Sequence, residues 1–123
     1  MLTSKDLMIG DYCKYTKGNY TDIRQIQLLD IEMYCEGIIF LEPIPLTAEI
    51  LEKNGWKKDT GGEEVWGNSK CWFTPHEYGK RDTIKSWEVE ICGKPNSFDG
   101  VIKYTYQLQH ALRLCGIKHE IKL

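Results

Sequence analysis

The sequence lacks the long apolar segment that a membrane-spanning helix requires. None of its uninterrupted apolar stretches approaches the roughly 18 residues needed to cross a bilayer. The opening residues, MLTSKDLMIGDY, contain no continuous apolar core of the kind found in signal peptides, so we expect no secretory leader. With 41% hydrophobic and 28% charged residues, the composition is typical of a soluble globular protein.

The cysteines lack the spacing of a disulfide scaffold or a zinc site. Their number is odd, their spacings are wide and no C-x-x-C occurs. We therefore expect free thiols and a reducing, cytoplasmic environment. Cys35 and Cys115 fall within apolar patterns, which predicts that both are small buried residues. The five cysteines are Cys13, Cys35, Cys71, Cys92 and Cys115.

The chain also lacks the basic excess of a nucleic-acid-binding groove. Its formal net charge is −2, with −3 in residues 1–46 and +1 in residues 47–123. One local cluster combines basic and aromatic side chains and is the candidate nucleic-acid contact, although a solvated loop explains it equally well. This cluster consists of Tyr78, Lys80, Arg81 and Lys85.

Motifs for catalysis, phosphate binding or zinc coordination are absent from the sequence. Cys71 and His76 form the best enzyme-like pair, to which Glu77 and His110 could be added if the fold brought them together. Their spacing is one that chance often supplies, and no nucleophile elbow accompanies it. We therefore expect no catalytic residue, no cofactor and no metal site.

The most informative stretch is PIPLTAEILEKNGW, residues 43–56, which predicts a short helix with defined ends. Pro43 and Pro45 oppose a helix upstream, and Thr47 supplies a hydroxyl for the N-cap. Gly55 stands where a left-handed C′ residue is needed, which places Trp56 at C″ in a Schellman ending. We expect this helix to divide the chain into two unlike parts.

The first part, residues 1–46, is predicted to be rich in β-strands. Residues 12–15 form an aromatic-rich strand, and the loop 16–21 follows. Apolar residues alternate over residues 29–35, which predicts a half-buried strand. Residues 38–41 return as a more buried strand. Together these segments predict a small antiparallel sheet or SH3-like barrel, of which we favour the barrel.

The second part, residues 47–123, is predicted to be α+β. Residues 59–62 suggest a hairpin turn, and residues 71–73 and 86–91 suggest strands. Polar loops are expected over residues 76–83 and 92–100. Thr105 is the expected cap of a final helix that ends at Gly116, and residues 119–123 are expected to form a terminal strand. The two parts are expected to form one compact α+β unit.

Three phrases of the chain, LMIGDY, PIPLTAEILEKNGW and YQLQHALRLCGIKHEIKL, resemble a known protein family. It is a family of small uncharacterised proteins of Bacteroides and related bacteria, often found in prophages and other mobile elements. The resemblance implies no activity. Where the family has histidine before Gln107-Leu108-Gln109, this chain has Tyr106, which favours a packing role at that position.

The aromatic content of 11% is more than so small a core needs in full burial. Some aromatic side chains are therefore expected at the surface, where they serve protein contacts. We expect a non-enzymatic accessory protein of a bacterial mobile element that binds another protein or itself. A weak nucleic-acid-binding module is the alternative, and a small hydrolase using Cys71 and His76 is a third hypothesis.

Overall fold

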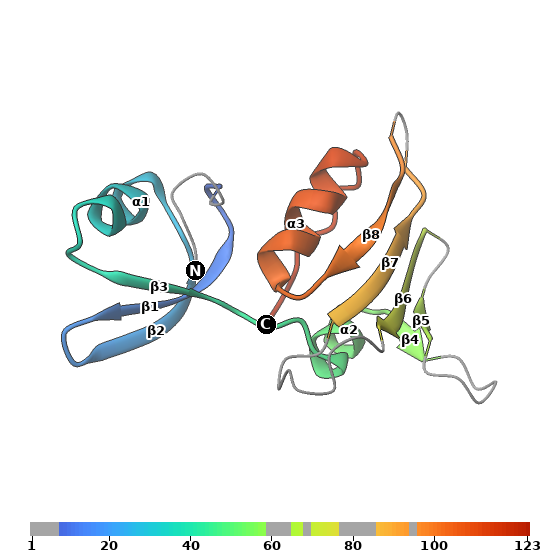
Figure 1. Ribbon diagram of the computed structural model, residues 1–123, viewed down its shortest axis with the longest axis horizontal. Helices are drawn as coiled ribbons and strands as arrows, with labels where there is room; N and C mark the ends of the chain where they lie inside the picture. The colour runs from blue at the N-terminus through green and yellow to red at the C-terminus, as the bar shows by residue number, and fades with distance from the viewer. Residues whose placement is uncertain (1–7, 59–64, 68–69, 77–85, 94–95) are drawn as a thin grey trace. The chain divides into compact units, whose positions relative to one another are not determined.

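The computed structural model describes residues 8–58, 65–67, 70–76, 86–93 and 96–123, and the chain forms two compact units. The first unit is Met1–Ile44 and the second is Pro45–Leu123. Both contain antiparallel strands and helices (Figure 1), so the predicted α+β class is confirmed. The division falls two residues before the predicted one. No described helix is long and apolar enough to cross a membrane.

The first unit contains a three-stranded antiparallel sheet with one helix. Strand β1 lies in the centre, between β2 and β3, and a tight turn at Gly18 (φ 59°) joins β1 to β2. The predicted small antiparallel sheet is confirmed, and its described strands do not close into a barrel. The elements are β1 (Tyr12–Lys17), β2 (Tyr20–Gln25), α1 (Leu28–Cys35) and β3 (Phe40–Pro43).

Helix α1 corrects the strand predicted over residues 29–35. Its start is stabilised by Asp30, whose carboxylate accepts the main-chain N–H of Gln27 at 2.8 Å. Its end is a Schellman motif, because Gly37 has φ 75° and the N–H of Ile38 donates to Met33 O at 2.9 Å. Over eight residues, alternating apolar positions also occur in a helix with apolar residues on most sides. The alternation of apolar residues therefore did not identify a strand here, and the capping residues at both ends of the segment favour a helix.

The second unit contains a five-stranded antiparallel sheet in the order β4-β5-β6-β7-β8. Helix α3 covers one face of this sheet (Figure 1). Trp56, just after α2, packs edge-on against Phe73 of β6 with ring centroids 4.9 Å apart, which brings the end of α2 to the sheet. The elements are α2 (Ala48–Lys53), β4 (Lys57–Lys58), β5 (Trp66–Gly67), β6 (Cys71–His76), β7 (Ser86–Ile91), β8 (Phe98–Ile102) and α3 (Thr105–Leu114).

Helix α2 has the predicted ends. Ile50 N–H donates to Thr47 Oγ1 at 3.3 Å, Gly55 has φ 89°, and Trp56 N–H donates to Leu51 O at 3.1 Å. The strand predicted at residues 86–91 is confirmed as β7. The two arms of the predicted hairpin are confirmed as the antiparallel pair β4 and β5. The predicted turn at residues 59–62 lies outside the described residues.

Several predicted boundaries were wrong. The terminal strand expected over residues 119–123 is an irregular segment, and the expected loops at 16–21 and 92–100 contain the beginnings of β2 and β8. Thr105 does not cap α3, because Tyr104 is the N-cap and Gln107 Oε1 accepts the N–H of Tyr104 at 3.0 Å. Cys115 is buried as predicted, whereas Cys35 is exposed.

Candidate functional site

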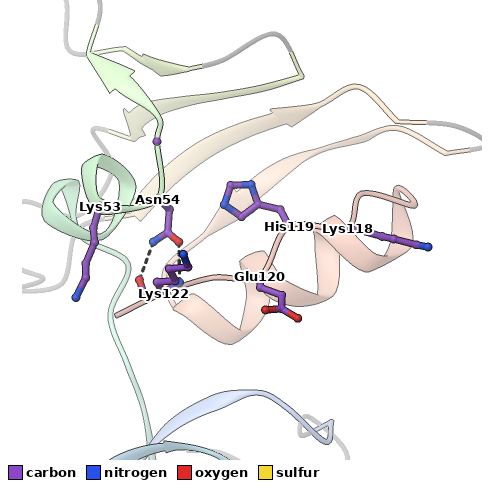
Figure 2. Close-up of a pocket in the computed structure, with 7 residues that line it drawn as sticks. Lys53, Asn54, Lys118, His119, Glu120 and Lys122 are labelled. Carbon is purple, nitrogen blue, oxygen red and sulfur yellow. Dashed lines mark hydrogen bonds between the residues drawn. The ribbon is translucent and has the colours of Figure 1, made fainter.

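One hollow of about 550 Å³ lies in the second unit, where the end of α2 meets the C-terminal segment (Figure 2). The segment reaches this position because Gly116 (φ 71°), just beyond the end of α3, reverses the chain. The hollow is lined by Lys53, Asn54, Gly55, Lys118, His119, Glu120 and Lys122.

The side chain of Asn54 holds the C-terminal segment in place. Its amide donates to Lys122 O at 2.7 Å and accepts the N–H of Lys122 at 2.6 Å, the two bonds drawn in Figure 2. The same amide donates to Ile50 O at 2.7 Å within α2. Residues 119–123 were expected to pair with a neighbouring strand. Instead, a side-chain amide makes the main-chain hydrogen bonds of this segment. The buried Ile121, 2% exposed, is fixed as a result.

The aromatic wall of the hollow is a stack of His119 on Trp56, with ring centroids 4.6 Å apart and an interplanar angle of 12°. Desolvation, with a contribution from the charge of Lys122, lowers the pKa of His119 below its ordinary value. The imidazole is therefore neutral at neutral pH. It packs on the core tryptophan instead of acting as a cation.

The lysines around the hollow do not converge on one point. Figure 2 shows the side chains of Lys53 and Lys118 extending away from Asn54 in different directions. The Lys53 ammonium donates to the main-chain oxygen of Leu123. Since the polar amide of Asn54 is already bonded to the main chain, the hollow is best explained as the joint that attaches the C-terminal segment to α2.

Cys71, the nucleophile of the hydrolase hypothesis, is buried within the second unit. Only 1% of the residue is exposed, and burial raises the pKa of its thiol to about 11, an increase that neighbouring Trp56 partly opposes. The thiol is therefore protonated at neutral pH and closed to a substrate. His76 ends β6 opposite Ser86, and its side chain lies outside the described part of the structure.

The remaining predicted positions have different outcomes. Tyr78, Lys80, Arg81 and Lys85 lie outside the described residues, as does Glu77, so the nucleic-acid contact stays a prediction. On α3, Tyr106 stacks on Tyr104 with centroids 6.2 Å apart and meets His110 edge-on at 5.5 Å. These contacts are those of a packing residue.

A second hollow, of about 390 Å³, lies beside the end of α3 and includes Cys92 and Cys115. Gly93 packs so closely here that a Cβ atom would lie 2.1 Å from Cys115 O. Burial raises the pKa of Cys115, and the charge of Cys92 adds to that effect. Within the described ranges, no group of three His, Cys, Asp or Glu side chains could hold a metal ion.

The first unit presents a feature that the sequence analysis missed, the exposure of its apolar helix. Six of the eight residues of α1 (LLDIEMYC) are apolar or aromatic, yet its buried residue is Asp30. Leu28 and Leu29 are 58% and 62% exposed. Phe40 at 64% and Ile23 at 55% are also exposed, but their pairing with Thr16 and Lys14 places them on the face of the sheet opposite Tyr15 and α1.

A charged cluster links α1 to its sheet. Arg24 of β2 lies 3.8 Å from the Asp30 carboxylate, and its guanidinium carbon sits 3.9 Å above the Tyr15 ring. Asp22 is a further partner of Arg24 at 3.5 Å. This arrangement satisfies the buried carboxylate while leaving the two leucines at the start of α1 in solvent.

Comparison of the chain with protein-family models, with curated proteins and with solved structures found no match.

Proposed function

We propose that this protein is a non-enzymatic accessory protein that acts by contacting another protein through the exposed apolar surface around α1. The resemblance of its three sequence phrases supports an origin in a bacterial prophage or mobile element. The five free cysteines support a reducing, cytoplasmic location.

The observation behind this proposal is the exposure of Leu28 and Leu29 at the start of α1. A short surface helix normally turns its apolar stripe towards the core, because burial is the main source of its stability. In α1 the buried residue is Asp30, and Leu28 and Leu29 are exposed to solvent. Leu28 and Leu29 are adjacent and both exposed, and exposed apolar side chains grouped in this way mark protein contact sites in soluble proteins.

Charge supports a protein partner over a nucleic acid. Residues 1–46 carry a net charge of −3, which repels phosphate from the unit that holds the apolar surface. The exposed leucine side chains suit the apolar centre of a protein interface.

The test compares two changes of the same chemical kind. The double substitution Leu28→Gln/Leu29→Gln removes the apolar surface of α1, and Leu114→Gln alters an equally exposed leucine (58%) of α3. Because all three leucines are exposed, we expect the free energy of unfolding of each variant to lie within about 0.5 kcal/mol of the wild-type value. A partner retained from a host extract, or self-association measured by analytical ultracentrifugation, should disappear in the double variant and persist in Leu114→Gln.

Equal binding by all three proteins would overturn the proposal. So would micromolar, salt-sensitive binding of single-stranded DNA or RNA that is abolished by Lys80→Ala/Arg81→Ala, because that result assigns the function to nucleic acid.

A further inference from the structure

The outer face of the five-stranded sheet is the face opposite α3 and Trp56. Along β7 the buried residues Trp87, Val89 and Ile91 alternate with the exposed Glu88 and Glu90, so the two faces are clearly distinguished. The pairing register places one row of outward residues across all five strands. This row consists of Lys57, Gly67, Trp72, Glu90 and Asp99, and the adjacent row consists of Thr74, Glu88 and Val101.

Trp72 forms an aromatic platform on this face. A Cβ atom on Gly67 would lie 2.8 Å from Cδ1 of Trp72, so the indole rests directly over the glycine of the neighbouring strand. The contact holds the ring in place while 37% of the residue stays exposed. The other three tryptophans, Trp56, Trp66 and Trp87, are at most 8% exposed.

Two carboxylates follow Trp72 along the same row of the sheet. Glu90 pairs directly with Trp72 on one side and with Asp99 on the other. Like charges that face each other across a strand pair destabilise a sheet. Within the described ranges, neither Glu90 nor Asp99 has an ion pair or hydrogen bond through its side chain. The sheet therefore contains a repulsion that a cation from outside would relieve.

We propose that this outer face is a docking surface for an arginine-bearing segment of a protein partner. The guanidinium stacks on the indole of Trp72 and donates hydrogen bonds to the Glu90 carboxylate, with Asp99 adding negative charge from the next strand. Val101, 50% exposed in the adjacent row, meets an apolar neighbour of that arginine.

Charge and shape both select this occupant. Within the described residues, Glu90 and Asp99 outnumber Lys57 on the row of Trp72, so this row repels phosphate and attracts basic side chains. The planar guanidinium matches both a flat indole and a carboxylate, whereas a lysine ammonium offers one compact charge. The surface differs in residues and in charge from the apolar α1 surface, so it stands independently of the proposed function.

The probe is a short, end-capped peptide of alternating arginine and valine, titrated into the full chain by isothermal titration calorimetry. A second peptide replaces each arginine by lysine. We expect the arginine peptide to bind more tightly than the lysine peptide. We expect its affinity to fall about tenfold or more in Trp72→Ala and in Glu90→Gln/Asp99→Asn.

The matched control is Glu32→Gln/Glu42→Gln, which removes two exposed carboxylates of the first unit and changes the net charge equally. It should bind the arginine peptide as the wild type does. A similar loss of affinity in this control would show general charge attraction and overturn the proposal. Undetectable binding to the wild type, or unchanged binding to Glu90→Gln/Asp99→Asn, would also overturn it.

The free protein provides a second measurement. Removing the repulsion between Glu90 and Asp99 should leave the midpoint of thermal unfolding unchanged or raise it. A folded and stable double variant then makes any loss of peptide affinity attributable to the surface itself.

Discussion

At the residue scale, Asn54 contributes more to the second unit than its place at the end of a two-turn helix suggests. Its amide makes three hydrogen bonds, two of them to Lys122, which lies 68 residues away in the sequence. Because the side chain is largely buried, deleting it removes both hydrogen bonds that hold the main chain of Lys122, while Ile50 O keeps the main-chain N–H of residue 54.

We therefore expect Asn54→Ala to lower the free energy of unfolding by about 2–3 kcal/mol. Chemical denaturation followed by circular dichroism measures this change. Asn96→Ala is the control, since the exposed Asn96 makes one hydrogen bond, at 3.3 Å, to Leu114 O. Equal effects of the two substitutions would show that Asn54 does not hold the C-terminal segment.

The buried cysteines predict how stability depends on pH. Burial raises the pKa of Cys13 to about 12, with a contribution from Asp11, and that of Cys71 to about 11, from an ordinary value of 9.0. Above that ordinary value the unfolded chain loses thiol protons that the folded chain keeps. The unfolded state then binds fewer protons, so stability is fully present below about pH 9 and falls as the pH rises above it.

Urea denaturation at a series of pH values from about 7 to about 10 should show this decline. Cys71→Ala should reduce its slope between about pH 9 and about pH 10, whatever its effect on stability at neutral pH. Cys35→Ala, which alters an exposed thiol, should leave the slope unchanged. A slope that is the same in all three proteins would contradict the assignment to buried thiols.

At the element scale, the three helices end by one device. Gly37, Gly55 and Gly116 all have positive φ, and in each case the following residue donates its N–H back to the helix. The beginnings of the helices differ, since α2 uses the Thr47 hydroxyl whereas α1 and α3 use the side chains of Asp30 and Gln107.

For α2 we expect Thr47→Ala to cost about 1 kcal/mol through the lost cap. Gly55→Val should cost more, because a β-branched residue is then held at φ 89°. Thermal melts measure both effects. Neutral outcomes for both substitutions would mean that these residues do not define the ends of α2.

At the scale of the whole molecule, the chain consists of two units of unequal size. The second unit contains its own sheet and buried tryptophans, and Trp87 Nε1 donates to Leu46 O at 2.8 Å within that unit. All five strands of its sheet belong to this unit.

A fragment spanning residues 45–123 should therefore fold alone. We expect one cooperative unfolding transition and near-ultraviolet circular dichroism from its buried tryptophans. A fragment that begins at residue 48, without Leu46 and Thr47, should be less stable, because the acceptor of Trp87 and the cap of α2 are both missing. An unfolded 45–123 fragment would contradict the division at Ile44.

Features that depend on local backbone chemistry were predictable from the order of the residues. The ends of α2 follow from Thr47 and Gly55, and β7 follows from alternation at residues 86–91, because capping, positive φ and a period of two are properties of neighbouring residues. The α+β class followed from the same signals. None of them depends on contacts between distant parts of the chain.

The remaining features arise from contacts that form only in the folded chain. Arg24 of β2 meets Asp30 of α1, while Leu28 and Leu29 stay in solvent. The C-terminal segment is irregular because the Asn54 amide occupies the place of a neighbouring strand. The outer row of the five-stranded sheet exists only after its strands are paired in register. Each outcome depends on contacts between residues distant in the sequence, which local patterns do not encode.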